Sequence, residues 1–332
     1  MNRSFALPLL ALAALPLRAD LFTLSAVNVD ALFNPGSDQQ TSFVGGTMAD
    51  VSRTSSSYFF GPGVTNLLGT ATSTAFARAD AGSLGVSTSV SIQATGATDL
   101  LKAKAGAYEN PGAGQFFDAY GALARFSTSD LAITPIPGAG VSGSGSVTAR
   151  LNLNLDGSFT SNPVVSASGT ASQSTTVYVS VGFNFTDPVT HFQGGNGFTG
   201  SLQVTQALGG AVTFGAGTGL LSGYTGGPLS LSTGATGLPI GTPISLDVSL
   251  WAITEVQAGG TLNFAGGADF YHTLSLPTSG SVIDLPAGYT ADSPDLHVSD
   301  NSYSAVPEPR GWAVLASAGL LGFALARRKS NR

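Results

Sequence analysis

Apolar and polar residues alternate with a period of two along much of the middle of the chain. The clearest runs are at 147–155 and 177–185, and further runs follow at 244–250, 86–92 and 270–276. Successive side chains of a β-strand point to opposite faces, so each run predicts a strand with one buried and one solvent-facing side. The pattern therefore predicts many half-buried strands.

No stretch between residues 30 and 305 has the 3.6-residue stripe of an amphipathic helix. Strands separated by Gly, Pro and Asn turns are typical of an all-β fold, so we expect a two-sheet antiparallel β-sandwich with jelly-roll-like connections over residues 20–291. Asp156 and Gly157 predict a hairpin turn after the strand at 147–155. A β-helix is the alternative for a chain rich in Gly, Ser and Thr, but no fixed short repeat is present.

The first 19 residues have the features of a secretory signal peptide. Arg3 precedes an apolar run from Phe5 to Leu17, and Ala19 provides a small residue for cleavage. A buried first helix is the alternative, but Pro8 and Pro16 would interrupt it. We expect export through the general secretion machinery and cleavage by signal peptidase.

The other end, residues 306–332, has three parts in a fixed order. Pro307, Glu308 and Pro309 come first, and an uncharged stretch at 311–326 follows, which as a helix would be about 24 Å long. Arg327, Arg328 and Lys329 then form a basic cluster. This stretch predicts a single transmembrane helix, with Trp312 at one interface and the basic cluster on the cytoplasmic side. The Ser-, Asp- and Pro-rich residues 292–305 are expected to form an extended spacer before it.

This tail resembles the PEP-CTERM sorting signal of Gram-negative, polysaccharide-producing bacteria, a tail also named ice-binding protein C-terminal domain. The resemblance covers about 27 residues and rests on the Pro-Glu-Pro motif, the short apolar helix and the basic end. It implies that an exosortase, a membrane transpeptidase, cuts the protein near the motif. The expected route is an inner-membrane-anchored precursor that is passed to the cell envelope or the exterior.

The net charge of −6 conceals a much more acidic body. Seven of the 13 basic residues lie in the two terminal segments, whereas 18 of the 19 acidic residues lie in residues 20–306, so this body carries a charge of about −12. Such a surface repels polyanions, and a nucleic-acid partner is excluded. No Cys is present, which excludes disulfides, thiolate nucleophiles and Cys-ligated metals.

Catalytic motifs are absent from the sequence. Two GxGxxG matches, at 138–143 and 195–200, are explained by the abundance of Gly, and no GxSxG or HExxH pattern occurs. The three His are far apart, and His272 is expected in the core. The body contains two Glu, Glu109 and Glu255, so a carboxylate pair for glycoside hydrolysis is not indicated. We expect no enzyme activity and no cofactor.

Two candidate binding features remain. Asp292, Asp295 and Asp300 cluster in a region without basic residues, and they are candidate calcium ligands, although solvated spacer residues are the favoured explanation. Trp251 lies on the polar side of its strand pattern and is a candidate sugar contact, with burial at an edge as the alternative. The aromatic runs at 58–60 and 116–117 are expected to pack in the core.

Together these features predict an exported structural or adhesive protein of the cell envelope or a biofilm matrix. Exopolysaccharide is the expected partner outside the cell, and exosortase is the partner during sorting. A secreted carbohydrate-binding module is the first alternative, and a polysaccharide hydrolase with an unobvious Asp pair is the second.

Overall fold

The computed structural model describes residues 20–31, 34–43, 48–61, 64–105, 122–162, 168–186 and 193–305. The signal peptide, the Pro-Glu-Pro tail with its apolar stretch, Glu109, the aromatic pair at 116–117 and His191 lie outside these residues. The side chains of His272 and of the aromatic run at 58–60 lie outside the described part as well. No helix among the described residues is both long and apolar enough to cross a membrane.

The described part of the chain is all-β, as predicted, and it contains nineteen strands and no helix. The strands are β1 (Asp20–Ala31), β2 (Asn34–Phe43), β3 (Met48–Gly61), β4 (Val64–Asp80), β5 (Ser83–Ala105), β6 (Ala122–Pro135), β7 (Ser146–Leu155), β8 (Ser158–Asn162), β9 (Ser168–Thr186), β10 (Gln193–Ala207), β11 (Thr213–Phe214), β12 (Thr218–Gly219), β13 (Leu229–Ser232), β14 (Thr236–Pro239), β15 (Ile244–Ser275), β16 (Ile283–Asp284), β17 (Tyr289–Asp292), β18 (Val298–Ser299) and β19 (Ser302–Tyr303).

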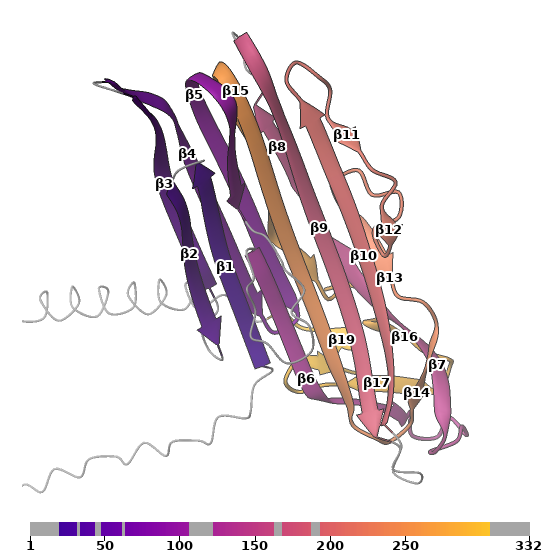
Figure 1. Ribbon diagram of the computed structural model, residues 1–332. Helices are drawn as coiled ribbons and strands as arrows, with labels where there is room; N and C mark the ends of the chain where they lie inside the picture. The colour runs from indigo at the N-terminus through magenta and orange to yellow at the C-terminus, as the bar shows by residue number, and fades with distance from the viewer. Residues whose placement is uncertain are drawn as a thin grey trace, which may run out of the picture.

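Seventeen of these strands form one large curled sheet, and β18 pairs with β19 (Figure 1). Every pairing between the described strands is antiparallel. A β-helix is built from stacked parallel strands, so this alternative is wrong for the described residues.

Strand β15 is the central strand of the sheet. Its first half lies between β6 and β9, while its second half pairs with β5 on one side and with β8 on the other. The sequence predicted two separate strands here, at 244–250 and 270–276, and the structure joins them into one strand of 32 residues. A bulge between Phe270 and Leu274 interrupts the regular alternation near its end.

The sheet folds over at glycines that lie next to one another on adjacent strands. Gly260 of β15 has φ +93°, and a Cβ there would lie 2.2 Å from the carbonyl oxygen of Ser168 on β9. Only Gly combines this backbone conformation with so close an approach. The register between β5 and β15 shifts at the same place, next to Gly96 with φ +77°, and Figure 1 shows β5 curling over at the upper end of the sheet.

The fold-over brings two layers of the sheet face to face across the core. The hydroxyls of Thr88 on β5 and Thr254 on β15 are 2.8 Å apart, although Thr88 pairs in the ladder with Ala268 and Thr254 with Ala105. Thr254 also lies 3.1 Å from the Thr175 hydroxyl on β9. All three threonines are almost fully buried. The Thr88–Thr254 hydrogen bond joins the two layers, whereas Thr175 is the ladder partner of Thr254 within one layer.

The core is lined by the apolar members of the predicted alternating runs. The buried side chains at 86–92, 147–155, 177–183 and 244–250 all belong to one hydrophobic cluster, together with many alanines. The Asp156–Gly157 hairpin is wrong, because β7 and β8 do not pair with each other. Strand β8 pairs instead with β15, and Gly157 lies so close to the ring of Phe270 that a Cβ there would be 2.2 Å from it.

Residues 292–305 do not form the extended spacer expected from their composition. Asp292 ends β17, which pairs with β6, and the β18–β19 hairpin follows directly. Ser293, Leu296 and Val298 are buried, so this segment is packed on the body. Asp130 holds it in place by accepting hydrogen bonds from the Ser293 hydroxyl (2.5 Å) and the backbone N–H of Asp295 (2.9 Å).

Candidate functional site

Trp251 lies on the outer face of β15, opposite the core. Its neighbours Leu250 and Ala252 are fully buried, whereas Trp251 is partly exposed. The ladder places it beside Tyr178 of β9, and the two ring centroids are 5.3 Å apart at an interplanar angle of 43°. The alternation of the sequence thus puts an aromatic pair on the outer face of the sheet, which also carries Ile253.

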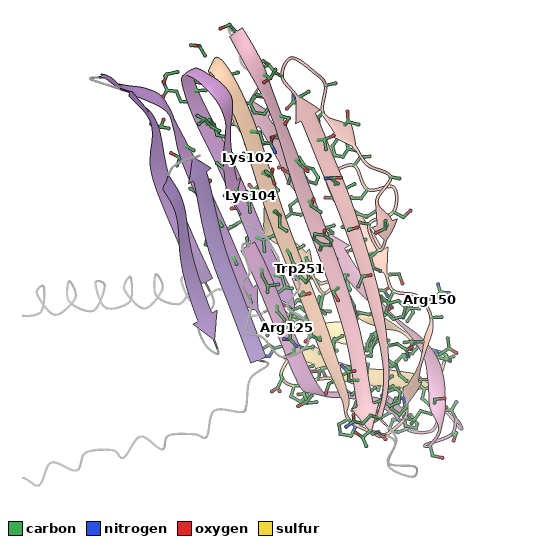
Figure 2. The ribbon with its side chains drawn as sticks, in the orientation of Figure 1. Lys102, Lys104, Arg125, Arg150 and Trp251 are labelled. Carbon is green, nitrogen blue, oxygen red and sulfur yellow. The ribbon has the colours of Figure 1, made fainter. Side chains whose placement is uncertain are left out.

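Basic residues follow the same face on either side of this pair. Figure 2 shows Lys102, Lys104, Trp251 and Arg125 one after another along the strands, while Arg150 lies elsewhere. Lys104 forms an ion pair with Glu255 at 3.0 Å. The Arg125 guanidinium binds Asp247, with Nε donating over 2.6 Å.

A groove of about 310 Å³ lies on this outer face, over β9 and its two neighbours. Its lining consists mostly of amide and hydroxyl side chains with one carboxylate: Ser172, Gln173, Ser174, Gln203, Thr205, Gln206, Ala207, Glu255 and Gln257. The amide of Gln203 donates to the Ser174 hydroxyl over 2.9 Å, and that of Gln257 donates to Glu255 over 2.7 Å. These hydrogen bonds hold the polar side chains in a defined arrangement.

Glu255 is the titratable acid of the groove. Burial raises the pKa of its carboxyl, but hydrogen bonds from Gln257 and Lys104 and the charges of Lys104 and Lys102 outweigh burial, so the pKa lies below its ordinary value. The groove therefore presents an ionised carboxylate at neutral pH. A carboxylate held in this way accepts hydrogen bonds and does not supply a proton.

Two larger concavities lie elsewhere on the body. One of about 480 Å³ is lined by glycines, serines, leucines, Phe198 and Thr199, and another of about 550 Å³ contains Asn184, Phe185 and Gln193. Neither lining contains an acidic, basic or His side chain, so neither has the groups for acid–base chemistry.

Of the aspartates expected as calcium ligands, Asp292 has a structural role for its carboxylate. Asp292 accepts a hydrogen bond from the backbone N–H of Asp300 over 2.9 Å, and Asp284, further along the same surface, accepts from Asn152 over 2.8 Å. Asp295 lies in the turn after β17, where its backbone N–H donates a hydrogen bond to the Asp130 carboxylate. Within the described ranges, no three Asp, Glu or His side chains are grouped as a metal site would require.

The candidate catalytic groups that the structure describes are not brought together. His297 lies in a tight turn with φ 55°, where its backbone N–H donates to Pro294 over 3.1 Å. Glu255 faces Lys104 and Gln257, an arrangement that neutralises its charge locally. A hydrolytic carboxylate pair would need a second acid opposite the first one.

The groove itself was missed at the sequence level. Gln203, Thr205 and Gln257 all lie on the polar side of alternating runs, which was a usable signal. Their assembly depends on the register in which β9 pairs with β10 and β15, and this register is a long-range property.

In comparisons with known proteins, no family model, curated protein or solved structure matches the chain. Functional proposals for this protein therefore rest on its own residues, fold and surface.

Proposed function

We propose that this chain is an exported structural or adhesive protein of the cell envelope or extracellular matrix, without catalytic activity of its own. The observation that carries the proposal is the order of the tail, with Pro307, Glu308 and Pro309 before an apolar stretch and a basic end. The signal-like residues 1–19 agree with it, because both ends give the same orientation across a membrane. Exosortase, signal peptidase and exopolysaccharide are the partners in this proposal.

The body offers a stable scaffold for such a role. We propose that its curled sheet is a jelly-roll-like β-sandwich, in which one layer carries Trp251 on its outer face. The direct hydrogen bond between Thr88 and Thr254 across the core supports this classification. Long antiparallel strands with a dry core suit a protein that must persist outside the cell.

The sorting proposal is tested by the mature C-terminus. In a bacterium that has an exosortase, we expect the exported protein to end near Pro309, as determined by mass spectrometry of the intact chain. Replacing Pro307, Glu308 and Pro309 by alanine should leave the uncut precursor in the inner membrane. An extracellular chain that still ends at Arg332 would refute the proposal.

A carbohydrate-binding module is the second candidate, and one observation favours it. Trp251 and Tyr178 form a partly exposed aromatic pair on the outer face of the sheet, which is the kind of surface on which the apolar side of a sugar ring packs. Loss of glycan binding in Trp251→Ala would support this candidate. Binding to no glycan would leave the structural role as the better account.

A further inference from the structure

The groove beside Glu255 and the Trp251–Tyr178 pair lie on one straight path along the outer face. On β15 the outward residues are Trp251, Ile253, Glu255 and Gln257, and the register pairs these in turn with Tyr178, Thr176, Ser174 and Ser172 of β9. At about 3.4 Å per residue, the path from Trp251 to Gln257 is roughly 20 Å long. The face thus presents an aromatic end and an amide-rich end in line with each other.

The two ends have complementary chemistry. Side-chain amides and hydroxyls both donate and accept hydrogen bonds, and the groove brings together Gln203, Gln257, Ser174 and the acceptor Glu255. Aromatic rings at the other end offer apolar contact area next to polar groups. A ligand that fits both ends is linear, is rich in hydroxyls and has apolar ring faces.

The overall charge of the body selects against an acidic polymer. Lys104 and Arg125, two of the cations beside the path, are paired with Glu255 and Asp247. A third cation, Lys102, is the ladder partner of Gln257 at the end of the path. Glu255 and Lys104 balance each other's charge at the groove, whereas the body as a whole carries about −12. A polyuronate would be repelled by this overall field, whereas an uncharged chain would not.

From this arrangement we infer that the groove and the aromatic pair form one extended site for an uncharged, linear polysaccharide. Trp251 and Tyr178 pack on sugar rings, while Gln203, Gln257 and Glu255 bind hydroxyl groups. This inference rests on the proposed extracellular role, and it adds the place and the chemical class of the ligand.

Affinity electrophoresis of the full-length protein in mild detergent tests the site. The uncharged probes are hydroxyethylcellulose, galactomannan and dextran, and alginate is the polyuronate probe. We expect retardation by at least one uncharged polymer. Gln203→Ala and Gln257→Ala should each weaken binding about five-fold, since each removes a hydrogen-bonding group, and Trp251→Ala should weaken it about ten-fold or more.

Gln193→Ala is the matched control. Gln193 is an exposed Gln on the same strand as Gln203 and on the same face of it, but it lies ten positions away and outside the groove. The control should bind like the unmodified protein. Gln203 is exposed and Gln257 is partly exposed, so the melting temperatures of these variants should stay unchanged and binding losses can be assigned to the site.

Three outcomes would overturn the inference: retardation by no uncharged polymer, tighter binding to alginate than to the uncharged probes, or equal losses in Gln193→Ala and Gln203→Ala. Loss of binding in Trp251→Ala, with none in the two groove variants, would also overturn it and would restrict the site to the aromatic pair. Failure of export or of tail cleavage would refute the proposed function instead, because retardation of the purified protein does not depend on sorting.

Discussion

Asn301 tests whether the C-terminal segment is part of the folded body. It is the second residue of the two-residue turn between β18 and β19, and Asp300 and Asn301 both have positive φ, at 49° and 59°. Such turns favour Asn because it tolerates the left-handed conformation. Its side chain donates to the carbonyl of Ile283 over 2.6 Å and accepts from the N–H of the same residue over 2.9 Å.

The cost of Asn301→Ala follows from these contacts. Ile283 is fully buried, so the substitution leaves a backbone donor and a backbone acceptor without their partner. Each such group costs about 1–3 kcal/mol, and the left-handed conformation costs Ala roughly 1–2 kcal/mol more than Gly. Water can reach the partly exposed turn, which favours the lower end, and we expect a loss of about 3–5 kcal/mol in the free energy of unfolding.

Urea denaturation followed by far-ultraviolet circular dichroism measures this loss. Asn301→Gly should be about 1 kcal/mol less damaging than Asn301→Ala, because it removes the same hydrogen bonds without the backbone strain. Asn154→Ala is the control, since Asn154 is exposed and accepts only a long hydrogen bond of 3.4 Å from Ser230; its stability should change by less than about 0.5 kcal/mol. If Asn301→Ala is as stable as this control, the contacts between Asn301 and Ile283 do not contribute to the stability of the body, and the reasoning is refuted.

The remaining predictions concern the core and its response to pH. Gly266→Ala should destabilise the fold by about 1–3 kcal/mol in urea, because its Cβ would lie 1.4 Å from the Gln173 amide oxygen, whereas Gly182→Ala, with no atom nearer than 3.8 Å, should have little effect; equal losses would contradict the close layer contact. Thr254→Val should cost about 1–2 kcal/mol by removing the hydroxyl that joins the layers, and an unchanged midpoint would speak against that link. Burial and a nearby carboxylate raise the pKa of Tyr224 to about 12, so its contribution to stability is complete below pH 10 and is lost as the pH rises toward 12; Tyr224→Phe should flatten this loss in thermal melts.

The local pattern of the sequence was sufficient for the class of fold and for the direction of side chains. Alternation at 86–92, 147–155 and 177–185 predicted which residues face the core, and all of them are buried except Phe185, which is partly exposed. It also put Trp251 on the outer side of its strand. These predictions held because the side-chain direction in a strand depends only on the parity of the position.

Local patterns failed where the outcome depended on distant neighbours. The runs at 244–250 and 270–276 predicted two strands, but β15 continues through Gly259 and Gly260, where β9 has a glycine, Gly169, opposite Gly260 in the register. Residues 292–305 have the composition of a spacer, and contacts with distant residues such as Asp130 and Ile283 make them part of the body.

The sequence by itself determined that strands form, which side of each is apolar, and that the body is strongly acidic. It also carries the tail motif on which the sorting proposal depends. The tertiary structure alone decided which strands lie side by side, and hence that Gln203, Gln257 and Glu255 share one groove in line with Trp251. The physical reason is that strand register is fixed by pairings between residues far apart in the chain, and their free energy depends on the whole folded sheet and not on the residues of any one strand.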